Sequence, residues 1–217
     1  MGGYIGTFCI PTALCCAEKG IEVKSIQSFE PGPTHELLKI NIDINELSDQ
    51  ITVHHAAMSS FDGYTKYRFR SGGSIGGAVF GNDDSDTMER IAPCFTIDGF
   101  CNGLEDQDGP MLVKLDTQGH EGKIMNRARK LISQKRAVWL IEFIAWTARS
   151  EIDDGRFADL LTNEFYVFEE HKEITSETMD AFIDEVDARP HRMADLILIP
   201  RDAPFTQKML ASIKEAS

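Results

Sequence analysis

The stretch VKLDTQGHEG at residues 113–122 is the most informative part of this sequence. An apolar run from Met111 to Leu115 predicts a strand that stops at Asp116. A glycine turn follows, and a helical pattern begins at Glu121. In an open α/β sheet the carboxyl ends of the strands face the ligand crevice, so Asp116 is expected to point into a site. The alternative is that Asp116 only caps the next helix.

A second pattern opens the chain. The sequence GGYIG at residues 2–6 precedes an apolar stretch, and glycines let a backbone approach a ligand closely at the start of a helix. About two dozen residues later a strand-like run ends in Glu30. A glycine turn followed by a strand-terminal acid is the pattern that holds the ribose of an adenosine cofactor. Each half is common alone, and their order and spacing make the pattern informative.

These motifs resemble those of the FkbM-type S-adenosylmethionine-dependent methyltransferase family. The similarity spans nearly the whole chain, and the blocks at 29–45 and 113–125 are the most specific. The matching segments are GGYIGTF at 2–8, FEPGPTHELLKINIDIN at 29–45, VHHAAMSSFDG at 53–63, TID at 96–98, VKLDTQGHEGKIM at 113–125 and LIEF at 140–143. Weaker matches are FADLLTNEFYVFEE at 157–170 and ADLILIPRD at 194–202.

Strands that alternate with helices favour an α/β fold. With the resemblance, they predict a Rossmann-like, doubly wound and mainly parallel sheet of about seven strands with helices on both faces. Residues 1–217 are expected to form a single methyltransferase domain. In the family a strand leads into the opening glycines, and this chain begins inside the glycine motif. The first strand is therefore expected to be missing or truncated, and the domain to be N-terminally incomplete.

The spacing of apolar residues and the positions of glycine, proline and capping residues predict the individual helices and strands. Expected helices cover residues 7–19, a segment capped by Thr34, 121–134, 157–162, 176–188 and 204–215. Expected strands cover residues 23–29, 51–57, 94–97, 111–115, 137–143, 165–168 and 196–199, with part of a hairpin at 64–69. The glycine-rich stretch 71–77 is interpreted as a surface loop or, alternatively, as a lid over the substrate.

The resemblance implies S-adenosylmethionine as the cofactor. Glu30 is expected to accept hydrogen bonds from the ribose hydroxyls; the alternative is a solvated strand end. Three glycines are expected at the methionine part: Gly2, Gly3 and Gly6. Ala56 and Ala57 are expected beside the adenine, although both are also ordinary core residues.

The candidate catalytic residues are Asp116, His120 and Glu142. A histidine with an ordinary pKa near 6.5 can take a hydroxyl proton at neutral pH. His120 is alternatively a helix-entry residue, and Glu142 is either a contact to the substrate hydroxyl or part of an ion pair. Glu121 is expected to cap the helix or to orient His120. The family often carries an acid where this chain has Gln118, which weakens any scheme that needs a carboxylate there, metal binding included.

The net charge, the cysteines and the hydrophobic pattern indicate which partners the protein can have and where it works. The formal net charge is −13, so the chain is expected to repel nucleic acid. Five cysteines without a CxxC pair indicate reduced thiols in a cytoplasmic setting. No apolar stretch approaches the length of a membrane span, and no secretory signal is visible. His54 and His55 are adjacent in a predicted strand and point to opposite faces, so no metal site is expected.

The leading hypothesis is therefore an O-methyltransferase that acts on a hydroxyl of a sugar, a glycan or a secondary metabolite. The alternatives are a nicotinamide-dependent oxidoreductase, because the glycine turn and Glu30 suit either adenosine cofactor, and a truncated, inactive cofactor-binding remnant. The sequence predicts neither the substrate nor the oligomeric state.

Overall fold

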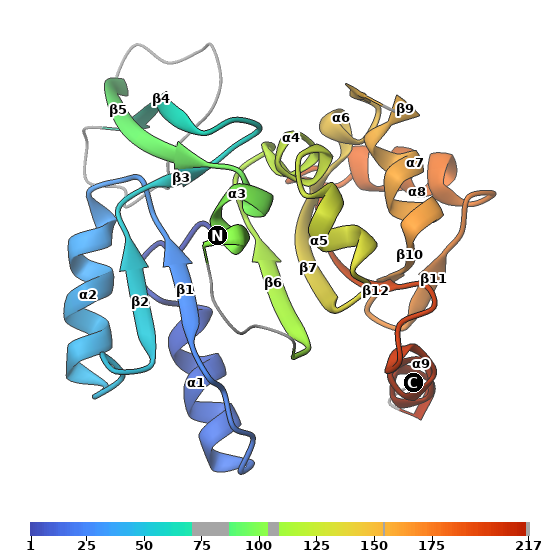
Figure 1. Cartoon of the computed structure of the whole chain (residues 1–217). Coiled ribbons are helices and arrows are strands. Elements are labelled where there is room, and N and C mark those ends of the chain that lie inside the picture. The colour runs from blue at the N-terminus through green and yellow to red at the C-terminus, as the bar shows by residue number, and fades with distance from the viewer. Residues whose placement is uncertain (71–86, 104–108, 154, 216–217) are drawn as a thin grey trace. The chain divides into compact units, whose positions relative to one another are not determined.

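The structure is a computed structural model that describes residues 1–70, 87–103, 109–153 and 155–215. The chain divides into two compact units, Met1–Phe95 and Thr96–Ser217. Figure 1 labels the helices and strands of both units. The predicted loop at 71–77 lies outside the described residues.

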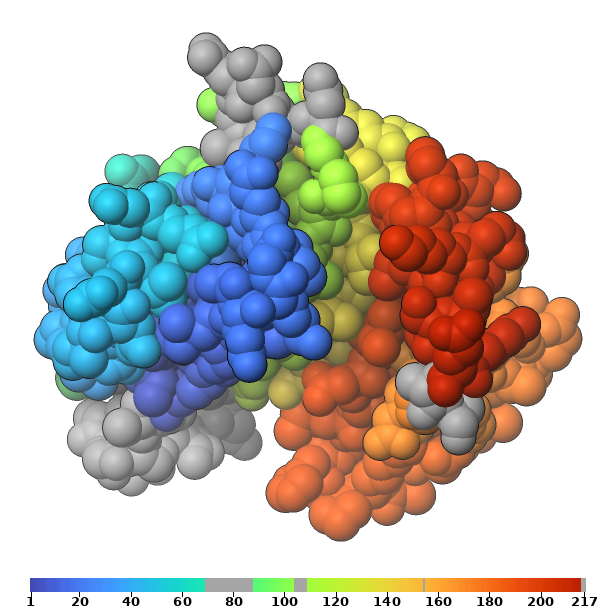
Figure 2. Space-filling view, turned by 90° about the horizontal axis from the view of Figure 1, so that it is seen from below, coloured from blue at the N-terminus to red at the C-terminus, as the bar shows by residue number. Residues whose placement is uncertain are grey.

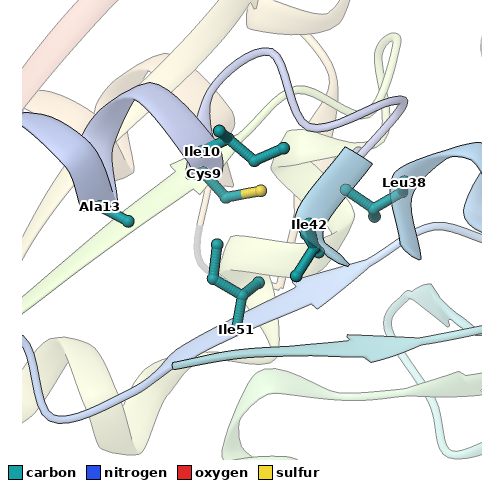
Figure 3. Close-up of a cluster of buried hydrophobic side chains, with 6 residues drawn as sticks. All are labelled: Cys9, Ile10, Ala13, Leu38, Ile42 and Ile51. Atoms are coloured by element: carbon teal, nitrogen blue, oxygen red, sulfur yellow. The ribbon is translucent and has the colours of Figure 1, made fainter. Parts of the chain in front are cut away.

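The first unit begins with two helices and a short parallel sheet. Strands β1 (Ile26–Phe29) and β2 (Ile51–His54) pair in parallel, and helices α1 (Cys9–Glu18) and α2 (Thr34–Ile44) pack beside them. The two helices and β2 share one apolar cluster, drawn in Figure 3, whose buried members are Cys9, Ile10, Ala13, Leu38, Ile42 and Ile51. The prediction that Thr34 caps this helix was wrong, because Pro33 holds the N-cap position of α2 and Thr34 is its first helical residue.

A separate three-stranded sheet completes this unit, in the order β3-β5-β4. Its strands are β3 (Ala57–Met58), β4 (Gly63–Arg70) and β5 (Thr87–Phe95), and β4 and β5 form the predicted hairpin. Two predicted boundaries were wrong. The strand expected at 51–57 ends at His54, and Ala57 pairs instead with Cys94 of β5. The strand expected at 94–97 ends earlier, because Thr96 caps helix α3 (Ile97–Asn102) and accepts from the Gly99 N–H.

The second unit is built on a five-stranded sheet in the order β11-β10-β12-β7-β6. Its strands are β6 (Met111–Leu115), β7 (Ala137–Ile144), β10 (Phe165–Glu169), β11 (Lys172–Ile174) and β12 (Met193–Pro200). Only β6 and β7 run parallel in this sheet; β12 pairs antiparallel with both β7 and β10, and β10 pairs antiparallel with β11. The fold is thus mixed α/β, and the single, mainly parallel sheet of about seven strands is corrected to separate mixed sheets.

Strand β7 lies inside the sheet, between β12 and β6, and its sequence, AVWLIEFI, is accordingly apolar on both faces. It pairs with β6 on one edge and with β12 on the other. Trp139 of β7 meets Phe165 edge to face, with ring centroids 6.4 Å apart, and both are almost completely buried. This packing holds β7 in place, and Glu142 lies near the end of that strand.

The helix expected at 121–134 is two short helices, α4 (Glu121–Asn126) and α5 (Arg129–Ser133). The break is stabilised by Asp98 of α3, whose carboxylate accepts from the backbone N–H groups of Lys130 and Leu131 at 2.8 and 3.0 Å. Those N–H groups lie in the first turn of α5, where no carbonyl of the same helix can serve them. A side chain 32 residues upstream therefore starts the second helix.

The remaining elements surround the five-stranded sheet. They are helices α6 (Ala145–Ala148), α7 (Phe157–Glu164), α8 (Met179–Asp187) and α9 (Thr206–Glu215), and the short hairpin of β8 (Glu151–Ile152) and β9 (Gly155–Arg156). Figure 2 shows α9, in red, on the surface of its unit, in keeping with Thr206 as its one buried residue among those described.

Candidate functional site

The glycine turn at the start of the chain lies against the end of β1. The Gly3 N–H donates to the Phe29 carbonyl at 2.8 Å. A Cβ on Gly3 would lie 2.5 Å from the Ser28 Oγ, so a larger residue here would force Ser28 to move. Gly2 and Gly6 have φ values of 74° and 96°, in the left-handed region that favours glycine. In this structure the close approach is thus between the turn and the strand.

Glu30 joins this turn to the loop after β1. Its carboxylate accepts from the backbone N–H groups of Tyr4 and Gly32, each at 2.8 Å, through different oxygens. The side chain is buried, with only 3% of the residue exposed. The alternative of a solvated strand end is therefore wrong. The sequence did not indicate Tyr4 or Gly32, because a backbone donor carries no signature of residue type.

The Glu30 carboxylate retains capacity to accept hydrogen bonds from ribose hydroxyls. An ionised carboxylate has about four lone-pair positions. Two of them accept from Tyr4 and Gly32, and one further position remains on each oxygen. Two neighbouring hydroxyls match that remaining capacity. Ala56 and Ala57 are both 3% exposed, so their small side chains lie within the packed part of this unit.

Two histidines hold the loop that follows Glu30. The rings of His35 and His55 stack with centroids 3.6 Å apart and planes 8° apart. His35 Nδ1 lies 2.9 Å from the Gly32 carbonyl oxygen, and His55 Nε2 lies 3.1 Å from the Pro31 carbonyl oxygen. Stacked rings that bond to adjacent carbonyls fix the course of this loop, which sequence reasoning had missed.

In the second unit, side chains meet at the ends of β6 and β7. Asp116 directly follows β6, and Glu142 lies near the end of the neighbouring parallel strand. Gln118 joins them, because its Nε2 is 3.2 Å from Asp116 Oδ1 and 3.0 Å from Glu142 Oε2. The structure therefore brings two of the three catalytic candidates together through a residue that the sequence had marked only as a departure.

Glu142 has the most strongly raised carboxyl pKa of this group. Burial first, and then the negative charges of Asp116 and Glu121, raise its pKa to about 7. Asp195, opposite Glu142 on β12, adds to the rise, while Lys114 opposes it. A carboxyl group with a pKa near neutrality is suited to exchange a proton at physiological pH.

Glu121 shapes the turn between these strands. Its Oε1 accepts from the Thr117 backbone N–H and hydroxyl at 2.7 and 2.8 Å, so Glu121 ties the end of β6 to the start of α4 and does not cap the N–H groups of that helix. The residue is fully buried, and burial raises its pKa. Its Oε2 has no hydrogen-bond partner among the described residues. This charge-bearing group thus stabilises the turn and also adds to the field at Glu142.

His120 occupies the N-cap position of α4, where its side chain makes no capping hydrogen bond. Burial, followed by the positive charge of Lys123, lowers its pKa to about 4. A base this weak holds a proton poorly at neutral pH. The position of His120 next to the turn agrees with the predicted helix-entry role.

The candidate residues form two groups, one in each unit. The cofactor candidates gather around the glycine turn and Glu30, and the catalytic candidates gather at the ends of β6 and β7. Across the described ranges, no three His, Cys, Asp or Glu side chains are arranged to hold a metal ion. His54 stacks on Phe29 and His55 on His35, so the adjacent histidines do face different partners.

The structure shows a mixed α/β fold in which two acids lie near the ends of the adjacent parallel strands β6 and β7. Residues 2–168 match the methyltransferase FkbM domain. The chain therefore belongs to the FkbM methyltransferase domain family, which confirms the predicted resemblance.

Two further comparisons were made. Among solved structures, the methyltransferase FkbM from Methylobacillus flagellatus KT is similar at 15% identity and a TM-score of 0.45, over 91% of this chain and 41% of that one. This chain thus spans less than half the length of that protein. A search of the curated proteins found no match. Within the described residues, no helix is both long enough and apolar enough to cross a membrane.

Proposed function

We propose that this chain is an S-adenosylmethionine-dependent O-methyltransferase that acts on a hydroxyl of a sugar, a glycan or a secondary metabolite. The observation that carries the proposal is Glu142, a carboxyl group with a pKa of about 7 at a strand end of a methyltransferase domain. Transfer of a methyl group to a hydroxyl oxygen requires the hydroxyl proton to leave. A carboxylate that is half protonated near neutrality is matched to that step.

In this proposal Glu30 binds the ribose through the lone pairs that Tyr4 and Gly32 leave free. Gly2, Gly3 and Gly6 form the turn at the methionine part, and Ala56 and Ala57 lie beside the adenine. When bound, S-adenosylmethionine supplies an electrophilic methyl group on its sulfonium. The chain's own residues hold the cofactor and orient the acceptor, and such positioning supplies much of the rate.

Glu142 is the proposed base, with Asp116 as the neighbouring carboxylate that keeps its proton affinity high. The proton from the acceptor hydroxyl passes to a Glu142 oxygen. His120 is less suited to this role, because its pKa of about 4 leaves it a weak base. Asp116 and Glu142 are both negative when ionised, so the surroundings favour an acceptor without phosphate or carboxylate near the reacting hydroxyl.

Calorimetric titration tests the cofactor. The parent is expected to bind S-adenosylmethionine and its demethylated product but not NAD. Glu30→Ala is expected to weaken binding by about 1–3 kcal/mol, the cost of removing a hydrogen bond to a charged group. Glu22→Ala, at an exposed position before β1, is the control. Binding of NAD alone would instead support the oxidoreductase, and binding of neither would support the inactive remnant.

Transfer of a labelled methyl group tests the reaction. Hydroxylated acceptors, first sugars and glycans and then polyphenols, are offered with labelled S-adenosylmethionine. With a productive acceptor, the rate is expected to rise through about pH 7 as Glu142 loses its proton. Glu142→Gln is expected to lower kcat about 10²- to 10⁴-fold and to remove that rise, because the amide cannot accept the proton. A Glu142→Gln enzyme with the parent's kcat and pH profile would exclude Glu142 as the base.

A further inference from the structure

One amide nitrogen holds the two carboxylates of the candidate site. Gln118 Nε2 lies 3.2 Å from Asp116 Oδ1 and 3.0 Å from Glu142 Oε2. Both partner atoms are carboxylate oxygens, which accept hydrogen bonds when ionised, so the nitrogen and not the oxygen of the amide must face them. An amide nitrogen has two N–H groups, and here each carboxylate receives one.

The backbone places Gln118 for this contact at a cost. Its φ is 55°, in the left-handed region that residues other than glycine rarely adopt. Contacts on both sides hold this conformation: Glu121 accepts from Thr117, and Gly119 lies so close to α6 that a Cβ on it would be 2.9 Å from the Trp146 ring.

The charged groups around Glu142 and the neutral Gln118 amide act on its proton in different ways. Asp116, Glu121 and Asp195 all favour the protonated form of Glu142, and Lys114 favours the anion. Lys114 is shared, because its Nζ lies 3.7 Å from Asp116 Oδ2 and 3.4 Å from Asp195 Oδ1. The Gln118 amide donates to Glu142 directly and adds no charge. Hydrogen bonding to the charged form of a carboxyl group stabilises that form.

We propose that Gln118 is a positioning residue: its amide holds the carboxylates of Asp116 and Glu142 together and stabilises Glu142 as the anion that accepts the acceptor's proton. The last clause rests on the proposed function, whereas the bridge itself does not. An acid at position 118 would crowd a third carboxylate against the other two and would leave the proton on Glu142. The glutamine therefore favours the ionised form of Glu142, which can accept a proton.

The test measures the titration of Glu142 directly, without cofactor or acceptor. Carbon NMR of glutamate-labelled protein follows the carboxyl resonances with pH, and loss of one resonance in Glu142→Gln assigns it. Gln118→Leu is expected to raise the Glu142 midpoint by about one pH unit, because a hydrogen bond to a charged group contributes about 1.5 kcal/mol and one unit equals about 1.4 kcal/mol. Gln118→Glu, nearly isosteric, is expected to raise it further.

The matched control is Gln207→Leu, at an exposed position of α9. A Gln118→Leu protein that is folded, with its Glu142 midpoint within about 0.2 units of the parent, would overturn the proposal, even if its melting temperature fell. If Gln118→Leu does not fold, Gln118→Glu decides by the same criterion. Because these titrations need no reaction, absence of methyl transfer would refute the proposed function and leave the bridge intact.

Discussion

The opposed pKa shifts of Glu142 and His120 predict an unusual pH dependence of stability. The pKa of Glu142 rises in the folded protein from 4.5 to about 7, so the folded state holds its proton more tightly than the unfolded state. This stabilisation is complete below pH 4.5 and is lost as the pH rises through 7. The pKa of His120 falls from 6.5 to about 4, so its contribution is complete above pH 6.5 and is lost as the pH falls through 4.

The two contributions are similar in size and opposite in slope. Each shift is about 2.5 units, which corresponds to about 2–3 kcal/mol after allowance for partial solvent screening. Between pH 4.5 and 6.5 the two slopes cancel, and the parent's free energy of unfolding is expected to change little on their account. Glu142→Gln is expected to leave a free energy that rises with pH over this range. His120→Asn is expected to leave one that falls until about pH 7.

The assay is urea denaturation followed by tryptophan fluorescence. Both tryptophans, Trp139 and Trp146, lie in the same unit as the substituted residues, so the signal reports the unfolding of that unit. Curves are collected at pH 4.5, 5.5, 6.5 and 8. Glu173→Gln, at an exposed position of strand β11, is the control for removal of one carboxylate elsewhere in the unit.

The decisive quantity is the stability difference between variant and parent at pH 8 minus that at pH 4.5. For Glu142→Gln we expect this quantity to be about 2–3 kcal/mol in favour of the variant at the higher pH. A value within about 0.5 kcal/mol of that for Glu173→Gln would refute the raised pKa of Glu142. With it would go the argument that this carboxyl group is poised to act as a base.

Three further substitutions test the packing around the two groups of candidate residues. Gly119→Ala is expected to destabilise its unit by about 1–3 kcal/mol more than Gly20→Ala destabilises the other, because both glycines have left-handed backbones but only a Cβ on Gly119 would meet a neighbour, the Trp146 ring at 2.9 Å; equal losses of unfolding free energy would contradict this clash. Asp98→Ala is expected to cost about 0.5–2 kcal/mol in urea denaturation, as removal of a helix cap does, and no loss would disprove the cap. Gly3→Ala is expected to lower the melting temperature of the first unit, and Ser28→Ala is expected to restore part of it by removing the Oγ that lies 2.5 Å from the new Cβ; a Gly3→Ala protein as stable as the parent would contradict the close approach.

The strands that flank the catalytic candidates were predictable because their apolar runs are long and well bounded. The strand at Met111–Leu115 was predicted to the residue, and the strand at Ala137–Phe143 to within one residue. Strand direction was not predictable, because an apolar run reads alike in a parallel and in an antiparallel pair. The antiparallel pairing of β12 with β7 therefore escaped the prediction of a mainly parallel sheet.

The candidate site shows the same division. The acids at strand ends were visible as residue types in a pattern, and Asp116 and Glu142 do lie together. The sequence did not show the burial and the neighbouring charges of these two acids. The raised pKa of Glu142 depends on burial and on charges from three other segments, and the bridge through Gln118 depends on a left-handed backbone that no residue type announces.

The cap that Asp98 provides has a consequence for local unfolding. Helix α5 has five residues, too few for a helix to persist by itself in water. Its first N–H groups are held by a side chain of α3, so opening of α3 removes the acceptor on which α5 depends. The two short helices are thus expected to open and close as one cooperative unit. The amide protons of Lys130 and Leu131 would then exchange with solvent at the rate at which α3 opens, although 32 and 33 residues separate them from Asp98 along the chain.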